Sequence, residues 1–212
     1  VAGSEGTSVE VTAVVDNPEV ARRDLTGFVE AGGFVSMAGG HHSRAVETGD
    51  VSWKLLPDIG RTGDGMAPWP VVNAQRTPGG DGARLEYDMT LFTTGPVEVT
   101  AYLSPRNAAL PWDGLKYAVS IDDAEPQVVD VIAATGADPT PLNRQWERLT
   151  SDNVNRTTTT HVIDEPGRHT LKFWMVDPTV ILQHLVIDTG GLEPSYLGPP
   201  ESLRVPHPRA RN

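Results

Sequence analysis

Apolar and polar residues alternate one by one along much of the chain, which is typical of β-strands with one buried side and one solvent-facing side. In ARLEYDMTLF, for example, the apolar residues Leu85, Tyr87, Met89 and Leu91 occupy every second position. The same alternation returns in VEVTAYL, LKYAVSI and TTTTHVI. The pattern predicts strands over residues 84–92, 97–103, 115–121, 127–132, 158–163, 169–176 and 180–188, and earlier strands over 8–15, 28–37 and 51–56.

Turn-forming residues separate these segments. The chain contains 21 glycines and 18 prolines, which favours many turns and short strands. Only residues 17–25 suggest a short helix, because Pro18 suits a first helical position. We therefore predict an all-β fold, an antiparallel β-sandwich or jelly roll, over residues 28–202. Residues 1–27 are expected to be a lead-in segment or linker strand, and residues 203–212 a disordered tail.

The order of the predicted strands places the long connections at one end of the sandwich. Successive antiparallel strands run in opposite directions, so their connections alternate between the two ends. Tight turns fall at one end, and the connections 68–83, 104–114, 133–157 and 177–179 fall at the other. A strand missed within 133–157 would break this alternation. Long loops on a rigid sandwich commonly form binding sites.

These long connections carry residue types that recognise sugars. Tryptophan faces pack on sugar rings, amides and carboxylates bind hydroxyl groups, and arginine pairs with carboxylates. The predicted carbohydrate-binding residues are Trp69, Arg106, Asn107, Trp112, Asn143, Trp146 and Asp177. The alternative for the loop tryptophans is that they pack against the sandwich as plugs. Trp53 and Trp174 lie within predicted strands and are expected to belong to the scaffold.

The sequence offers no catalytic residue. It lacks GxSxG, HExxH, Walker and dinucleotide-binding motifs. Asp122 and Asp123 precede Pro126 in a pattern typical of a turn. His41 and His42 would point to opposite faces of a strand, so they are not expected to bind one ion. The absence of cysteine excludes disulfides and thiolate ligands. The residues thus indicate a binding or accessory module rather than a complete enzyme.

Charge narrows the choice of partners. The formal net charge is −11, and an acidic surface repels phosphate backbones and anionic lipid headgroups. Neither nucleic acid nor a membrane is therefore an expected partner. A chain that begins at Val1, without an initiator methionine, is expected to be a mature or excised fragment.

Several segments together resemble a known family. They are WKLLPDIGRTGDGMAPWP, LEYDMTLF, YLSPRNA with LKYAVSIDD, and PGRHTLKFWMVDPTVILQHLVIDTGGLEPSYLGPPES. In this order they resemble the C-terminal domain of glycoside hydrolase family 115, the xylan α-1,2-glucuronidases, over residues 28 to 202.

The resemblance implies a large multidomain bacterial enzyme, secreted or periplasmic, that removes 4-O-methyl-glucuronic acid from xylan. The catalytic carboxylates of such an enzyme lie in an upstream barrel domain, and its C-terminal part is a β-sandwich similar to carbohydrate-binding modules. The chain would then be non-catalytic on its own. It would bind glucuronoxylan, xylo-oligosaccharides or another plant polysaccharide, and its partner would be the upstream catalytic domain.

The alternative is a structural domain that packs on the catalytic domain or mediates dimerisation without binding sugar. Its motivation is the proline-rich segment GGLEPSYLGPPES, in which Tyr196 can lie along another surface.

The sequence departs from the family in one respect that concerns calcium. The family's first strand ends in a sequence with two glutamates, similar to the acidic pair that holds calcium in related sandwiches. Here that segment, residues 36–41, reads SMAGGH, with Ala and Gly at those places. Because calcium prefers several oxygen ligands, no cofactor is predicted at this position; a calcium site elsewhere, for example around Asp188, stays open.

Overall fold

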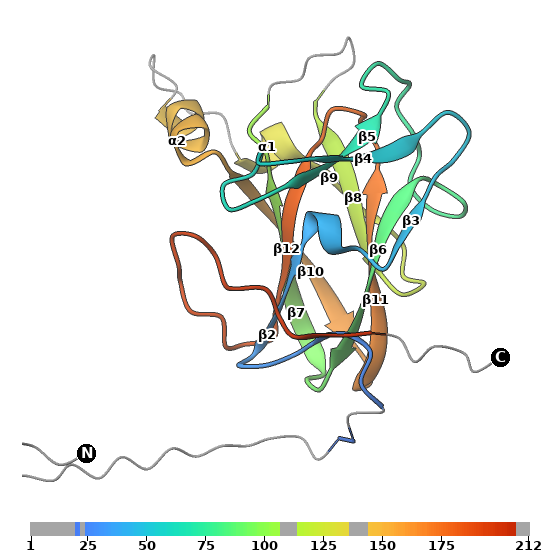
Figure 1. Ribbon diagram of the computed structural model, residues 1–212, viewed down its shortest axis with the longest axis vertical. Helices are drawn as coiled ribbons and strands as arrows, with labels where there is room; N and C mark the ends of the chain where they lie inside the picture. Colours follow the sequence, from blue (N-terminus) through green and yellow to red (C-terminus); the bar gives the residue numbers. More distant parts are fainter. Residues whose placement is uncertain (1–19, 22–23, 107–113, 136–143, 207–212) are drawn as a thin grey trace, which may run out of the picture.

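The computed structural model describes residues 20–21, 24–106, 114–135 and 144–206, which form two β-sheets packed face to face (Figure 1). The first sheet has the order β13-β1-β6-β11-β8-β9, and β3 also pairs with β6. Its strands are β1 (Gly27–Val29), β3 (Arg44–Val46), β6 (Arg84–Leu91), β8 (Lys116–Ile121), β9 (Gln127–Asp130), β11 (Gly167–Met175) and β13 (Arg204–Val205).

The second sheet has the order β10-β7-β12-β5-β4, and β2 also pairs with β12. Its strands are β2 (Phe34–Ala38), β4 (Ser52–Leu56), β5 (Gly65–Trp69), β7 (Gly95–Leu103), β10 (Asn155–Ile163) and β12 (Leu182–Asp188). Neighbouring strands are antiparallel except β1 and β6, which are parallel. The predicted all-β antiparallel sandwich is therefore confirmed.

The core lies between the two sheets and is filled by the apolar positions of the alternating strands. Tyr87, Tyr117, Phe28 and Phe173 are among the largest fully buried side chains. The rings of Tyr117 and Phe173 stack with their centroids 5.0 Å apart, an offset contact that aromatic pairs favour.

The second face of β6 differs from the prediction. Its polar side is not open to water, because Glu86 is only 7% exposed. Arg44 on β3 donates two hydrogen bonds to the Glu86 carboxylate, and Arg84 donates a third. The alternation in the sequence reveals the polar face, but it does not reveal that β3 pairs alongside β6 and places Arg44 next to Glu86.

Two helices lie in the long connection between β9 and β10: α1 (Val131–Thr135) and α2 (Arg144–Asp152). The strand predicted over 127–132 ends at Asp130, whose Oδ1 accepts hydrogen bonds from the backbone N–H groups of Ile132 and Ala133 and so caps α1. Within the described part of 133–157 the first strand is β10, so the alternation of connections between the two ends holds. None of the described helices is long and apolar enough to cross a membrane.

The N-terminal predictions are met in part. The segment 28–37 contains two strands, β1 and β2, because Gly32 and Gly33 adopt φ angles of +63° and +78° and turn the chain between them. The strand predicted over 8–15, and most of the helix predicted over 17–25, lie outside the described residues.

The segment that follows β12, residues 189–203, crosses the outer face of the second sheet and is called the strap below (Figure 1). It covers Tyr102 and His184, whose rings meet edge to face, and Leu192 packs on Val186. The strap then reaches β13, where Val205 pairs with Gly27 of β1. Residues 203–205, predicted to belong to a disordered tail, thus continue the ordered domain; residues 207–212 lie outside the described part.

Candidate functional site

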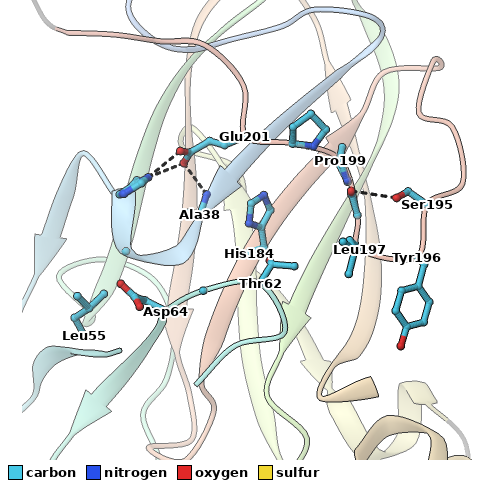
Figure 2. Close-up of a pocket in the computed structure, with 15 residues that line it drawn as sticks. Ala38, Leu55, Thr62, Asp64, His184, Ser195, Tyr196, Leu197, Pro199 and Glu201 are labelled. Carbon is cyan, nitrogen blue, oxygen red and sulfur yellow. Dashed lines mark hydrogen bonds and ion pairs between the residues drawn. The ribbon is translucent and has the colours of Figure 1, made fainter. Parts of the chain in front are cut away.

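A cleft of about 780 Å³ opens between the strap and the loop that joins β4 to β5 (Figure 2). The 3-10 helix Gly39–His41 closes one side of this cleft. His184 of β12 lies on its floor. We call it the strap cleft.

Apolar side chains line part of the strap cleft. Leu55 comes from β4, and Tyr196 and Leu197 come from the strap. They are among the most exposed large hydrophobic side chains of the described residues, at 50%, 67% and 57% exposure. Exposed apolar groups gathered at one hollow are unusual on a soluble domain and commonly mark a binding site.

Two carboxylates lie on the polar side of the strap cleft. Glu201 accepts hydrogen bonds from His41 Nδ1 at 2.8 Å and from the backbone N–H of Ala38 at 3.0 Å (Figure 2). Asp64 accepts from the backbone N–H of Asp58 at 3.0 Å. Because these bonds fix both carboxylates, each presents its remaining acceptor sites in a defined direction.

The floor of the strap cleft is neutral. His184 Nε2 lies 2.6 Å from Ser36 Oγ, which also donates to the carbonyl oxygen of Pro199. Burial lowers the pKa of His184 from 6.5 to about 4, although Glu201 acts in the opposite direction. His184 is therefore uncharged at neutral pH and offers hydrogen bonds without a charge.

Tyr196 joins the strap to two other parts of the chain. Its hydroxyl group donates to Asp152 Oδ1 at the end of α2, with a length of 2.9 Å. Its ring lies over the guanidinium group of Arg61, with 3.6 Å between Arg61 Cζ and the ring centroid. The side chain is therefore held in place at the mouth of the cleft, although most of its surface is exposed.

Two of the predicted sugar-binding residues, Trp69 and Arg106, lie where long connections begin, and neither lines the strap cleft. Trp69 ends β5, is 40% exposed, and has Lys54 Nζ 4.0 Å from its ring centroid. Arg106 is exposed in the connection that follows β7. Asn107, Trp112 and Asn143, and the side chain of Trp146, lie outside the described residues, so their roles remain predictions.

Asp177 has a different setting from the one predicted. It is 1% exposed, and its two carboxylate oxygens accept hydrogen bonds from Gln75 Nε2 and from the backbone N–H of Lys116. The buried carboxylate thus ties the β11–β12 connection to the β5–β6 connection and to the first residue of β8. Its placement does not support a contact with sugar hydroxyls.

The sequence does not predict the strap cleft. Its residues come from several separated segments, and of these only the strap segment, GGLEPSYLGPPES, is interpreted in the sequence as a contact surface. Tyr196 was the available signal, since an aromatic residue among prolines in a terminal segment has no strand alternation to explain it.

The fold belongs to the class of two-sheet, mainly antiparallel β-sandwiches, with a cleft beneath the strap. A solved structure with this fold is that of BtGH115A, a family GH115 4-O-methyl-alpha-glucuronidase with specificity for decorated arabinogalactans; its TM-score is 0.54 at 17% identity, over 84% of this chain and 19% of that one. The chain thus spans about a fifth of the length of that enzyme.

The family follows from the sequence itself. The model of the glycosyl hydrolase family 115 C-terminal domain matches residues 27–201. The chain belongs to this family, as the resemblance predicted, and corresponds to its non-catalytic C-terminal domain.

Two carbohydrate-binding modules are also similar in fold. The C-terminal CBM6 of LamC, a marine laminarinase from Zobellia galactanivorans, has a TM-score of 0.45 and 12% identity over 73% of this chain and 98% of that one. A family 35 module from Clostridium thermocellum has a TM-score of 0.46 and 11% identity over 73% and 96%. No curated protein sequence matches the chain.

Proposed function

We propose that this domain binds polysaccharide as the accessory C-terminal domain of a family 115 glycoside hydrolase, and that the strap cleft is the binding site. One observation carries the proposal: Tyr196 and Leu197 of the strap and Leu55 of β4 place exposed apolar surface on opposite sides of the cleft, and the carboxylates of Glu201 and Asp64 line the same cleft (Figure 2). A sugar ring has an apolar face and a hydroxyl-bearing edge, and this combination matches both.

Glucuronoxylan and xylo-oligosaccharides are the proposed ligands, followed by other plant polysaccharides. The upstream catalytic domain of the same enzyme is the proposed partner, and the proposed location is outside the bacterial cytoplasm. The support is the family membership, together with the strap cleft on the described residues. Among these residues no three His, Asp or Glu side chains converge in a group suited to a metal ion.

The test is calorimetric titration of the chain with xylan, glucuronoxylan and arabinogalactan. Binding of at least one of them is expected, and Tyr196→Ala should weaken it because the ring contributes apolar contact. The matched control is Trp69→Ala, which removes an exposed aromatic ring that does not line the strap cleft. Loss of binding in Trp69→Ala alone would move the site to the long connections, and no heat with any polysaccharide would refute the proposal.

A structural role is the second candidate, and one observation favours it. Trp69, Val71 and Val72 are close in sequence and all exposed, and Val72 reaches 76% exposure. Such a stretch can pack on another domain. Mixing the chain with a catalytic portion that lacks this domain should then raise the melting temperature of that portion, and Val72→Asp should abolish the effect.

A further inference from the structure

Arg61 carries a buried guanidinium group without an acceptor. Its Nε, Nη1 and Nη2 atoms are all buried, and none has a hydrogen-bond partner among the described residues. Other arginines differ: Arg44 and Arg84 donate to Glu86, and Arg76 donates to Asp50. A buried charged donor without an acceptor is strongly unfavourable, so it is rarely kept in a fold without a reason.

The surrounding hydrogen bonds hold Arg61 in this place. Its backbone N–H donates to Gln183 Oε1 at 2.9 Å, and Gln183 Nε2 donates to the carbonyl oxygen of Asn153. Asn153 Nδ2 in turn donates to the carbonyl oxygen of Ile59, two residues before Arg61. The loop is thus tied to β12 and to the segment after α2, which gives the guanidinium a supported position.

Tyr196 covers the guanidinium group from the solvent side. The ring stacks on it at 3.6 Å, and only one side-chain hydrogen bond, to Asp152, holds the hydroxyl group. A hollow of about 20 Å³ beneath the strap is lined by Arg61 and shares His184 and Leu197 with the strap cleft. The guanidinium therefore lies next to the cleft, with Tyr196 as its cover.

The geometry points to Arg61 as a binding site for the carboxylate of an acidic sugar in a polysaccharide held by the strap cleft. The planar guanidinium group matches a planar carboxylate with two parallel hydrogen bonds. As the carboxylate enters, the Tyr196 ring moves from the guanidinium onto the face of the sugar that carries it. This inference rests on the proposed function, because Arg61 can bind the carboxylate only when the strap cleft holds the polysaccharide.

Because the net charge of the chain is −11, any preference for an acidic polysaccharide has to arise within the site itself. An acidic chain attracts no acidic polymer over a distance, so preference for a charged glycan has to come from direct contact. A second arginine, Arg156, is exposed near Tyr102, with 5.8 Å between Arg156 Cζ and the ring centroid, and does not line the strap cleft. It provides a matched comparison of equal charge.

The experiment compares glucuronoxylan with the same polymer after chemical reduction of its carboxyl groups. Calorimetry should show that the chain binds the acidic form about tenfold more tightly, the effect of a charge-assisted hydrogen-bond pair. Arg61→Gln should abolish this preference and leave the reduced form bound as before, while Arg156→Gln keeps the preference. Arg61→Lys, which retains the charge without the planar fork, should keep only part of it.

A further variant tests the cover. Tyr196→Phe retains the ring and removes the hydrogen bond to Asp152, so it should bind the acidic form several-fold more tightly and the reduced form equally well. Unchanged binding of the acidic form would overturn the role of Tyr196.

The remaining outcomes separate the two proposals. Equal binding of both polymers by the unaltered chain would overturn the role of Arg61 but leave the proposed function intact. The hollow beside Arg61 would then be a space for solvent rather than for a carboxylate. Binding of neither polymer would defeat the proposed function itself. Poly-glutamate that binds as tightly as glucuronoxylan and depends on Arg61 would identify a protein partner and overturn the assignment to a sugar.

Discussion

Ser36 and Ser202, 166 residues apart, exchange two hydrogen bonds: the backbone N–H of Ser202 donates to the carbonyl oxygen of Ser36, and the backbone N–H of Ser36 donates to Ser202 Oγ. On this side β2 has no neighbouring strand in its sheet, and unpaired strand edges invite association with other chains. The strap supplies hydrogen-bond partners for the backbone of this edge: the hydroxyl group and the backbone N–H of Ser202. The nearby Pro199 and Pro200 have no backbone N–H to donate.

Ser202→Ala should destabilise the domain. The backbone N–H of Ser36 would lose its acceptor at a position that is fully buried, which corresponds to about 1 kcal/mol in the free energy of unfolding. Urea denaturation measures this difference. Ser195→Ala is the control, because Ser195 is exposed and donates only to the carbonyl oxygen of Gly198; equal losses in the two variants would contradict the role of Ser202.

The stability of the domain should fall as the pH is lowered from about 6.5 to about 4. His184 is neutral in the folded state because burial lowers its pKa to about 4, while in the unfolded chain it takes up a proton near 6.5. Over this window the unfolded state binds more protons, so up to about 3 kcal/mol is lost as the pH falls. Below the folded pKa this contribution does not change further.

His184→Gln should flatten that part of the profile, measured as the free energy of unfolding at several pH values. Burial also lowers the pKa values of His42 and His161, so a smaller slope of the same sign should remain. If the variant and the unaltered chain show the same slope between pH 4 and 6.5, the role assigned to His184 is wrong.

Glu86 should be among the most sensitive charged positions of the first sheet. Its carboxylate is nearly buried and accepts from both Arg44 and Arg84, and Arg84 is nearly buried as well. Glu86→Ala would leave Arg84 without its partner, at a loss of about 3 kcal/mol in unfolding free energy. Arg44→Ala should cost about 1 kcal/mol or less, because Arg44 is 62% exposed and Glu86 keeps Arg84. Denaturant unfolding of both variants tests this order.

Arg61→Met should leave the domain as stable as before or more stable. The substitution removes a buried charge that lacks an acceptor and retains the aliphatic contact with Tyr196. The comparison is Arg84→Met, because Arg84 also lies over an aromatic ring, that of Trp174, but is hydrogen-bonded to Glu86. We expect a loss of about 2 kcal/mol or more for Arg84→Met and less than about 1 kcal/mol for Arg61→Met. A reversed order in thermal or urea unfolding would show that Arg61 contributes to folding.

The strands could be predicted from the sequence because their signal is local. In β6, Leu85 to Leu91 alternate within a single segment, and the antiparallel fold follows from the repetition of such segments. The sequence does not predict helix α2, because a helix of nine mostly polar residues is too short to show a sustained helical period.

The strap cleft could not be predicted, for a physical reason. Arg61 and Tyr196 look ordinary in the sequence, one after a glycine and the other between a serine and a leucine. What distinguishes Arg61 is that its guanidinium has no hydrogen-bond acceptor within the described part of the chain, a property of the three-dimensional packing. The loop tryptophans, by contrast, are conspicuous in the sequence because large aromatic residues are rare in polar connections between strands.

The pairing of Gly27 with Val205 means that the chain enters and leaves the domain at one corner. Whatever precedes residue 27 and follows residue 205 is therefore joined to the sandwich at a single pivot. A domain attached in this way can swing as a rigid unit while the strap cleft, on the outer face of the other sheet, keeps its shape.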